Sequence, residues 1–527
     1  MAIDRDMRNL EAFGMTKKNV LEWLEHTAEL YPNKIAFQDS NNDLAFLDVM
    51  NKAKAIGTVV SKIKKKAPIA VFVTRNVMSI ISYFGVVYGG HAYAPIDSAL
   101  PEARISSILN TLRPAAVIIN KDDADRVYPV IAESGIDTVL VFEEIVESTT
   151  NDDELLLVRE KMISTDPLYV LFTSGSTGVP KGVITSHLSL MLYIESYTKV
   201  MKINDNDILG NQSPLDYIAA IRDIYIPLLT GCSSIIIPKE YFIQPERLFD
   251  FMNSKHISAV GWSVSAFTLL SKLNCFENEG LLTLNKISFS GSEMPGICLS
   301  EWQKRLPDAT FVNQYGPTEA TASCTYYVVD HLVDSDERIP IGKPYDNYRI
   351  LLLDKNLNSV ADGEIGEICI TGPILALGYY NDQNRTNEAF VAKTVENGYS
   401  ERIYRTGDLG RMRKDGLLEF HGRMDRQVKH MGHRVELDEV EIAVSGIEGV
   451  SKNVVLYDAK REHLVLYYTG SATKKSIALE LRKTLPDFMV PRKIVNLGSI
   501  PLLPNGKIDM KVMEELLNEG CNLRNTI

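Results

Sequence analysis

The chain has 527 residues, of which 45% are hydrophobic and 24% are charged, as in ordinary soluble globular proteins. Its 56 basic and 68 acidic residues give a net charge of −12, which argues against nucleic-acid binding as the main function. The six cysteines include no C-x-x-C pair, no apolar run reaches the ~20 residues of a membrane helix, and the N-terminus lacks a signal-peptide pattern. We therefore expect a cytoplasmic protein without a cysteine metal site.

Helical and extended patterns alternate through the first part of the chain. Asn19–Leu30 has apolar residues at helical spacing, and a second helical segment runs from Val77 to a stop at Gly89. Buried strands are predicted at Lys34–Phe37, Ile69–Thr74, Ala116–Asn120, Thr138–Phe142, Leu168–Phe172, Ser234–Ile237, Ser258–Gly261 and Ile287–Ser290. This alternation predicts an α/β fold, with parallel or mixed sheets covered by helices.

The pattern changes near Tyr348. Arg349–Leu353 and Gly366–Thr371 are short strands separated by turn residues, which indicates a small barrel-like subdomain over about 345–424. A polar stretch near Met424 marks a linker, and the rest of the chain mixes strands with helices. We therefore expect a large N-terminal domain of residues 1–424 and a small α+β C-terminal domain of residues 425–527.

A loop of small and hydroxylic residues follows the strand predicted at Leu168–Phe172. Its residues are Thr173, Ser174, Gly175, Ser176, Thr177 and Gly178, with Lys181 shortly after. Glycine lets backbone N–H groups converge on an anion, hydroxyls add donors and lysine adds charge, so the loop is predicted to bind phosphate. A Walker P-loop requires G-x-x-x-x-G-K-[ST], and that template fails because Pro180 stands at its second glycine. The ordered S-G-S-T-G-x-P-K-G string argues against a plain surface turn.

This string closely resembles the phosphate loop of the acyl-adenylate-forming superfamily, which includes peptide-synthetase adenylation domains, acyl- and aryl-CoA synthetases and luciferases. The resemblance covers essentially the whole chain, and the motifs NQYGPTE, YRTGDL, GRMDRQVK and NGKID follow in family order. It implies formation of an acyl-AMP from ATP and a carboxylic acid, with Mg²⁺ and release of pyrophosphate. It also implies that residues 425–527 move as a domain about Asp425.

The NQYGPTE motif supplies the next group of candidate residues. Tyr315 offers a flat face and Gly316 a sharp turn, which together could support an adenine. A hard oxygen ligand beside phosphate oxygens suits Mg²⁺, and by resemblance Glu319 is the metal ligand and, with Thr318, a catalytic residue. A glutamate after a turn is otherwise a common helix-start residue. The resemblance adds three further nucleotide-binding residues: Gly291, Ser292 and Asn313.

The YRTGDL motif places Asp408 after a glycine, where its carboxylate could accept both ribose hydroxyls. The resemblance assigns Asp408 to the ribose and Arg423 to the ribose or a phosphate, although an aspartate beside a glycine is more often a turn former. Gly432 matches a glycine that lets a loop approach a pantetheine arm. A charged, exposed linker is the competing interpretation for Arg426 and Lys429.

The segment Pro504–Asp509 puts Lys507 on an Asn-Gly turn. A lysine on such a turn is normally just solvated, but the resemblance identifies Lys507 as the mobile catalytic lysine. Attack of one anion on another is slow unless positive charge is placed where they meet. We therefore expect Lys507 to contact the substrate carboxylate and the α-phosphate, and to leave when the small domain reorients for thiol transfer.

The acid pocket is predicted from the segment Pro214–Gly231. Ungapped alignment of its P-L-L-T-G end places Ile218 where relatives that activate α-amino acids carry an aspartate for the ammonium. Burying an unpaired ammonium costs several kcal/mol, so we expect an acid without an α-ammonium, such as an aryl, oxo or hydroxy acid. Asp216 could still bind an amine through a shifted register. The predicted substrate-binding residues are Asp216, Ile218, Ala219, Arg222, Gly261, Ser288, Ser290, Gln314, Ala322 and Ser323.

The small and hydroxylic walls of this pocket favour a polar substituent on the acid. Arg222 could bind an acidic or hydroxyl group of the substrate, or be neutralised by Asp216 or Asp223.

No carrier-protein module follows Lys507, so we expect the acceptor to be the phosphopantetheine thiol of a separate carrier protein. The alternatives are an acyl- or aryl-CoA synthetase that uses free CoA, an amino-acid-activating adenylation domain, and a nucleotide-binding regulator without catalysis. Intact Lys181, Glu319, Asp408 and Lys507 argue against the regulator. We expect neither a nucleic-acid partner nor a membrane partner.

Overall fold

The computed structural model describes residues 17–275, 280–394, 398–503 and 507–518. The chain forms two compact units. The first comprises Met1–Ser98, Thr111–Phe172 and Gly182–Met424, and the second comprises Ala99–Asn110, Thr173–Lys181 and Asp425–Ile527. One break thus lies at the expected linker, whereas the phosphate loop and a second short N-terminal segment belong to the second unit.

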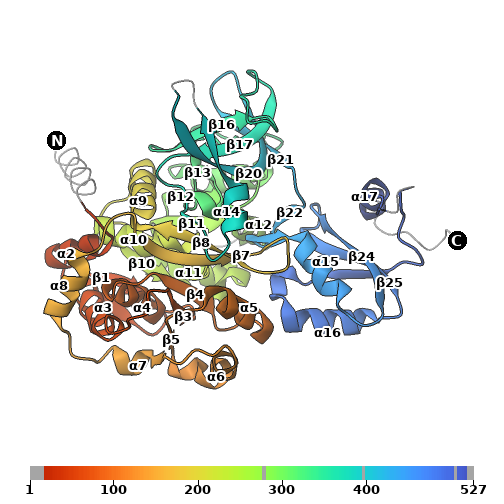
Figure 1. Cartoon of the computed structure of the whole chain (residues 1–527). Coiled ribbons are helices and arrows are strands. Elements are labelled where there is room, and N and C mark those ends of the chain that lie inside the picture. The colour runs from red at the N-terminus through yellow and green to blue at the C-terminus, as the bar shows by residue number, and fades with distance from the viewer. Residues whose placement is uncertain (1–16, 276–279, 395–397, 504–506, 519–527) are drawn as a thin grey trace. The chain divides into compact units, whose positions relative to one another are not determined.

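The largest sheet of the first unit contains β1 (Ile35–Gln38), β2 (Asp43–Ala45), β9 (Ile208–Asn211), β10 (Ser233–Ile236), β11 (Ala259–Ser263), β12 (Lys286–Ser290), β13 (Thr310–Tyr315), β14 (Thr325–Val329) and β15 (Lys343–Pro344). Its order is β15-β14-β13-β12-β11-β9-β10-β1-β2. The strands from β13 to β1 run parallel, and β14, β15 and β2 are antiparallel to their neighbours. The predicted parallel core of the α/β fold is confirmed (Figure 1).

A second sheet contains β3 (Ile69–Val73), β4 (Tyr93–Asp97), β5 (Ala116–Ile119), β6 (Val139–Val141), β7 (Pro167–Thr173), β8 (Lys181–Ser186) and β18 (Gly378–Tyr379). Its order is β18-β8-β7-β4-β3-β5-β6, parallel from β7 to β6. All residues of β3 and β5 are buried, as expected for parallel strands that are covered on both faces of the sheet. The predicted strand at Thr138–Phe142 is shorter, because a helix begins at Phe142.

A smaller sheet holds β16 (Arg349–Leu353), β17 (Ile365–Thr371), β19 (Phe390–Thr394), β20 (Ser400–Met412) and β21 (Leu418–Arg423). All its pairs are antiparallel, in the order β16-β17-β20-β19 with β21 on β20. This sheet occupies the range predicted for a barrel-like subdomain. The register of β20 and β21 sets Asp408 opposite Arg423.

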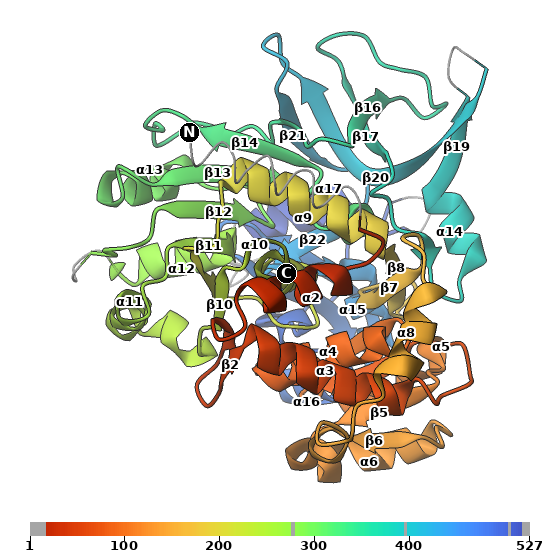
Figure 2. The same ribbon diagram turned by 90° about the vertical axis from the view of Figure 1, so that its left-hand side faces the viewer.

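The helices before the linker are α2 (Leu21–Leu30), α3 (Phe46–Val60), α4 (Val77–Tyr88), α5 (Glu102–Leu112), α6 (Ala124–Glu133), α7 (Phe142–Ile145), α8 (Asp152–Glu160), α9 (His187–Met201), α10 (Ala220–Thr230), α11 (Pro245–Ser254), α12 (Val264–Lys272), α13 (Gly296–Arg305) and α14 (Gln383–Ala389). Figure 2 shows α3 and α4 side by side. Asn76 caps α4 by accepting the Ser79 N–H at 3.0 Å. Gly85 permits the close approach, because a Cβ there would lie 2.4 Å from Ile56. The apolar sides of α2, α3, α4, α9 and α10 share one buried core with the sheets.

Beyond the linker, the second unit contains β22 (Gln427–His430), β23 (His433–Glu436), β24 (Val450–Asp458), β25 (His463–Gly470), β26 (Lys493–Asn496), α15 (Leu437–Ser445), α16 (Lys474–Thr484) and α17 (Met510–Asn518). Strands β24, β25 and β26 form one sheet, and α15 lies against β24 (Figure 1). Apolar side chains such as Val440 of α15, Leu466 of β25 and Leu481 of α16 form its buried core. This is the α+β mixture that the sequence predicts.

Candidate active site

The predicted phosphate loop connects β7 to β8 and belongs to the second unit. The Gly178 N–H donates to the Gly175 carbonyl at 2.9 Å, and Gly178 has a φ of +80°, which L side chains rarely adopt. Thr173 Oγ1 is buried without a hydrogen-bond partner, and Lys181 is 9% exposed. The exposed residues of the loop include Ser176 and Thr177. The loop therefore combines a tight turn with a buried, unpaired hydroxyl and a largely buried lysine.

A carboxylate of the second unit already lies against this loop. Glu439 Oε2 accepts the Gly175 N–H at 3.2 Å, its Oε1 pairs with Arg104, and Ser174 Oγ donates to the Arg434 carbonyl at 2.8 Å. Glu439 is 2% exposed, and burial raises the pKa of its carboxyl although Arg104 and the Gly175 N–H act to lower it. The Gly175 N–H that binds this carboxylate is also a suitable donor to a phosphate oxygen, so the loop has the chemistry of an anion site.

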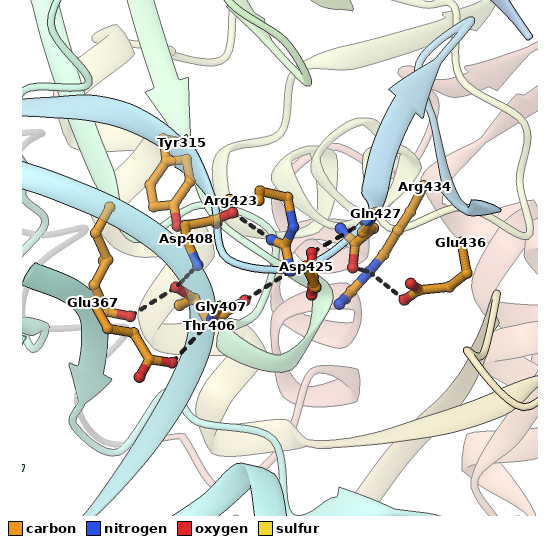
Figure 3. A network of polar contacts seen from close by, with 11 residues as sticks. Tyr315, Glu367, Thr406, Gly407, Asp408, Arg423, Asp425, Gln427, Arg434 and Glu436 are labelled. Carbon is orange, nitrogen blue, oxygen red and sulfur yellow. Dashed lines mark hydrogen bonds and ion pairs between the residues drawn. The ribbon is translucent and has the colours of Figure 1, made fainter. Parts of the chain in front are cut away.

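Asp408 is the centre of a buried polar network in the first unit (Figure 3). Its carboxylate accepts hydrogen bonds from the Tyr315 hydroxyl and the Arg423 guanidinium. Its N–H donates to Thr406 Oγ1 at 2.9 Å, and Arg423 also donates to the Thr406 carbonyl at 3.1 Å. Burial, followed by the charge of Asp408, raises the pKa of Tyr315 well above its usual range. Tyr315 is therefore a neutral donor at every physiological pH.

Glu367 on β17 supports this network, and the sequence did not single it out. Its Oε2 accepts bonds of 2.9 and 2.6 Å from Arg405, and its Oε1 accepts the Gly407 N–H at 3.1 Å (Figure 3). Gly407 has a φ of +73°. These contacts hold the glycine turn that precedes Asp408, so the predicted ribose ligand lies on a rigid support.

The turn after β13 requires glycine. A Cβ on Gly316 would lie 2.5 Å from Ser323 Cα and 2.7 Å from the Ala322 carbonyl oxygen. Both contacts are with backbone atoms, which cannot rotate away. The turn leads into a short 3₁₀ helix, Thr318–Ala320, that carries Glu319.

Glu319 is fully buried, and its Oε1 accepts a hydrogen bond from the Tyr379 hydroxyl at 2.8 Å. Mg²⁺ commonly takes one or two protein carboxylates together with phosphate oxygens and water. Glu319 fits such an ion as a single hard ligand beside a nucleotide. In the described part of the chain, no group of three or more histidine, cysteine, aspartate or glutamate residues is placed to hold a metal ion.

Three further predicted nucleotide-binding residues lie on or after neighbouring parallel strands. Gly291, with a φ of +104°, and the exposed Ser292 follow the end of β12. Asn313 lies on β13, and its amide donates to the Pro340 carbonyl at 2.8 Å. Ligands of open α/β sheets bind outside the carboxyl ends of such strands.

A second polar group, which we call the Arg222 cluster, surrounds the guanidinium of Arg222 on α10; its other members are Tyr193, Tyr197, Ala219, Gly261, Ser288, Gln314, Ser323 and Tyr345. Arg222 donates to the Ala219 carbonyl at 3.3 Å, to Gln314 Oε1 at 3.2 Å and to the Gly261 carbonyl at 3.0 Å. Its guanidinium carbon lies 5.5 Å from the centre of the Tyr197 ring. The fold thus gathers six predicted substrate-binding residues, because Ser323 donates to Gln314 Oε1 at 3.2 Å and Ser288 lies 2.8 Å from the Tyr197 hydroxyl.

The expected neutralisation of Arg222 by Asp216 or Asp223 is partly met. Arg222 is 1% exposed and makes no direct ion pair with a carboxylate of the described residues. Burial raises the pKa of Asp223 to about 6, and the charge of Arg222 acts to lower it, so the two groups attract one another. The Asp223 carboxylate also accepts the Asn211 amide at 2.8 Å. Burial, followed by the charge of Asp97, raises the pKa of Asp216 to about 7, although the charge of Arg75 acts to lower it.

The tyrosines of the Arg222 cluster were missed by sequence reasoning. Tyr193 and Tyr197 are four residues apart on α9, a spacing that places two side chains on one helix face. Tyr345 packs edge-on against Tyr193, with ring centres 6.3 Å apart. No described side-chain contact joins four other predicted pocket residues to the cluster: Asp216, Ile218, Ser290 and Ala322. Ser290 meets it only through the backbone, as the register partner of Gln314. Ile218 is 9% exposed and belongs to the main apolar core.

In the second unit, Asp425 Oδ1 accepts the Gln427 N–H at 3.2 Å (Figure 3). Arg426 pairs with Glu441 at 2.7 Å and with Asp438 at 2.9 Å, so the interpretation of Arg426 as a simple exposed linker charge is wrong. Gly432, with a φ of +82°, lies in the turn between β22 and β23.

Lys507 is exposed, next to the bridge that pairs Leu502 with Ile508. Its carbonyl accepts the Leu503 N–H at 2.7 Å. The Asn-Gly turn predicted before it, at 504–506, lies outside the described residues. The role of Lys507 as the catalytic lysine remains a prediction.

Residues 24–380 match the family of AMP-binding enzymes. The chain is 30% identical to a D-alanine--D-alanyl carrier protein ligase of Lactiplantibacillus plantarum, over 95% of this chain and 99% of that protein. It is also 30% identical to bacitracin synthase 1 of Bacillus licheniformis over 94% of this chain, but it spans only 9% of that longer protein.

Among solved structures, the Vibrio cholerae adenylation domain AlmE, in complex with glycyl-adenosine-5'-phosphate, has a TM-score of 0.81 at 20% identity, covering 95% of this chain and 98% of that one. At this identity the likeness supports the fold alone. Within the part of the chain that the structure describes, no helix has the length and apolar character that a membrane crossing requires.

Proposed function

Because the chain belongs to the AMP-binding enzyme family, and so is an ATP-dependent adenylate-forming ligase, we propose that it activates an acid without an α-ammonium and loads a carrier protein. The acceptor is the phosphopantetheine thiol of a separate carrier protein. The nearly full-length similarity to D-alanine--D-alanyl carrier protein ligases supports this choice over free CoA.

The first half-reaction joins the acid to AMP. A carboxylate oxygen attacks the α-phosphorus of ATP, the bond between the α-phosphorus and the bridging oxygen breaks, and pyrophosphate leaves. The loop Thr173–Lys181 offers hydroxyls, backbone N–H groups and a lysine to the phosphates. Mg²⁺ held by Glu319 would neutralise part of the phosphate charge. Lys507 would supply positive charge where the two anions meet.

The Asp408 network is the observation that carries the nucleotide assignment. A buried carboxylate, held between Tyr315 and Arg423 and supported through Thr406 and Gly407, is suited to accept the two ribose hydroxyls. The aromatic ring of Tyr315, on the same strand end as the glycine turn at Gly316, is suited to stack on the adenine.

In the second half-reaction the carrier thiol, as thiolate, attacks the acyl carbonyl and AMP leaves. The thiol proton passes to solvent. Reorientation of the small domain about Asp425 would remove Lys507 and bring the Gly432 turn towards the pantetheine arm. Each of these roles is proposed from the position of the residue in a matched motif.

The absence of an α-ammonium on the substrate is inferred from Ile218. Its side chain is buried among apolar residues, where a substrate ammonium would have no counter-charge. Asp216 is the residue that would overturn this inference, because its part-buried carboxylate could take an amine.

The test is acid-dependent ATP–pyrophosphate exchange across a panel of aryl, oxo and hydroxy acids, β- and γ-amino acids and α-amino acids. We expect the best substrate to lack an α-amino group. Preference for a standard α-amino acid would refute the interpretation of Ile218, and absence of exchange with every acid would refute the proposed function. Thioester formation with a holo-carrier protein, compared with free CoA, identifies the acceptor.

A further inference from the structure

We propose that Tyr379 is a positioning residue for the metal: its hydroxyl sets the orientation of the Glu319 carboxylate that binds Mg²⁺ beside the phosphates of ATP. This inference rests on the proposed function, because it names a further residue for the metal site of the same reaction. No motif in the sequence singled out Tyr379, which lies 60 residues beyond Glu319.

The Tyr379 hydroxyl is bonded directly to the proposed metal ligand. It donates to Glu319 Oε1 at 2.8 Å, and both residues are buried, with Glu319 0% and Tyr379 5% exposed. A hydrogen bond to a carboxylate is stronger than one between neutral groups, and it fixes the direction of the carboxylate oxygens. A tyrosine hydroxyl is a neutral donor, so it orients this carboxylate without cancelling the charge that attracts a cation.

The backbone around Glu319 is held by the same segment. The Glu319 carbonyl accepts the Ala376 N–H at 2.9 Å, and Thr321 Oγ1 donates to the Ile374 carbonyl at 2.8 Å. Both the main chain and the carboxylate of Glu319 are thus tied to residues 374–379.

Tyr379 is itself firmly placed. On β18 it is the register partner of Val183 on β8, the strand that follows the phosphate loop. Its N–H donates to Thr386 Oγ1 at 2.9 Å, and its ring packs edge-on against Phe390, with ring centres 5.8 Å apart. Gly378 permits this packing, because a Cβ there would lie 2.7 Å from Thr386. The hydroxyl therefore comes from a side chain with little freedom to move.

Partners of this kind determine how well a side chain holds a metal ion. Groups that hydrogen-bond a metal ligand fix its orientation, and their loss typically costs about 10- to 100-fold in metal affinity or activity. A tyrosine with a purely structural role would affect stability but would leave the effect of Mg²⁺ on nucleotide binding unchanged. The two roles therefore differ in a measurable way.

The experiment compares Tyr379→Phe with the parent chain. The variant keeps the ring that packs on Phe390 and removes only the hydroxyl. Isothermal titration calorimetry measures the affinity for α,β-methylene-ATP, which cannot release pyrophosphate, in Mg²⁺ and in EDTA. We expect the gain in affinity that Mg²⁺ gives to shrink by about tenfold. Affinity for AMP, which lacks the β- and γ-phosphates, should stay the same.

The matched control is Tyr348→Phe. The Tyr348 hydroxyl donates to the Ala320 carbonyl at 3.4 Å, so it is bonded to the main chain of the same short helix, and this variant should keep the full Mg²⁺ gain. The double variant Tyr379→Phe, Glu319→Gln should show the same Mg²⁺ gain as Glu319→Gln alone, because Tyr379 acts through Glu319. Circular dichroism checks that each variant folds.

An unchanged Mg²⁺ gain in folded Tyr379→Phe, an equal loss in Tyr348→Phe, or additive losses in the double variant would overturn this proposal and leave the proposed function standing. An unchanged gain in Glu319→Gln would overturn it together with the ligand role of Glu319. Failure of the proposed function is seen separately, as absence of pyrophosphate exchange with every acid in the parent chain.

Discussion

Replacing Asp408 by asparagine separates the structural role of its carboxylate from the proposed ribose contact. The Asp408 side chain is 10% exposed and that of Arg423 is 14% exposed, so their ion pair is largely shielded from water. Asparagine keeps the shape but removes the charge, and one arm of its amide is a donor. Breaking a buried pair costs about 3 kcal/mol or more, so we expect the free energy of unfolding to fall by about 3 kcal/mol in denaturant titrations.

The same variant should bind AMP more weakly. Hydrogen bonds to a charged group contribute roughly 1.5–3 kcal/mol each, and a neutral amide can accept from one hydroxyl but less strongly. For two ribose hydroxyls we expect a loss of about 3 kcal/mol, or roughly 100-fold in Kd, measured by isothermal titration calorimetry. The matched ligand is 2′,3′-dideoxy-AMP, which lacks both hydroxyls and should bind the parent and the variant alike. An equal loss for both ligands would refute the ribose assignment, because the effect would then come from the protein network alone.

Three other substitutions test separate parts of the account. Glu319→Gln should raise the Mg²⁺ concentration for half-maximal pyrophosphate exchange by about tenfold or more without changing the KM of the acid; an unchanged Mg²⁺ titration would contradict a ligand role. Gly316→Ala should lower the free energy of unfolding by about 2–3 kcal/mol, because its Cβ would lie 2.5 Å from Ser323 Cα, whereas Gly446→Ala, with 3.6 Å to the nearest atom, should be nearly neutral. His187 is buried and burial lowers its pKa to about 3, so the unfolded chain takes up a proton between pH 6.5 and about 3 that the folded chain does not. Stability is therefore lost as the pH falls through that window. In a plot of the free energy of unfolding against pH, His187→Gln should lower the slope by about 1.4 kcal/mol per pH unit; parallel plots for parent and variant would contradict this.

Local sequence patterns predicted where the loop and several of the residues proposed to bind the nucleotide lie in the fold. The phosphate loop connects β7 and β8, because the apolar, strand-forming residues of β7 are followed directly by glycine and hydroxylic residues. Asp408 and Arg423 were separate candidates in sequence, and the antiparallel register of β20 and β21 brings them together. Such features depend on neighbouring residues or on one strand pair, which the sequence pattern specifies.

The hydrogen-bond partners of the buried charged side chains could not be predicted from the sequence. Asp223 follows Arg222 directly, yet successive side chains on a helix point in different directions, and Asp223 bonds to Asn211. The partners of Arg222 come from α10, β11 and β13, so they depend on how the sheet and the helix pack. For the same reason the approach of Glu439 to the Gly175 N–H has no local signal.

The most direct test of the central claim measures both half-reactions of Lys507→Ala. We expect ATP–pyrophosphate exchange to fall by about 100-fold or more, as for loss of a group that stabilises charge in a transition state. Transfer of the acyl group from a synthetic acyl-AMP to the thiol should stay within a few-fold of the parent. Equal loss of both half-reactions, or undiminished exchange, would contradict the claim that Lys507 brings the carboxylate and the α-phosphate together.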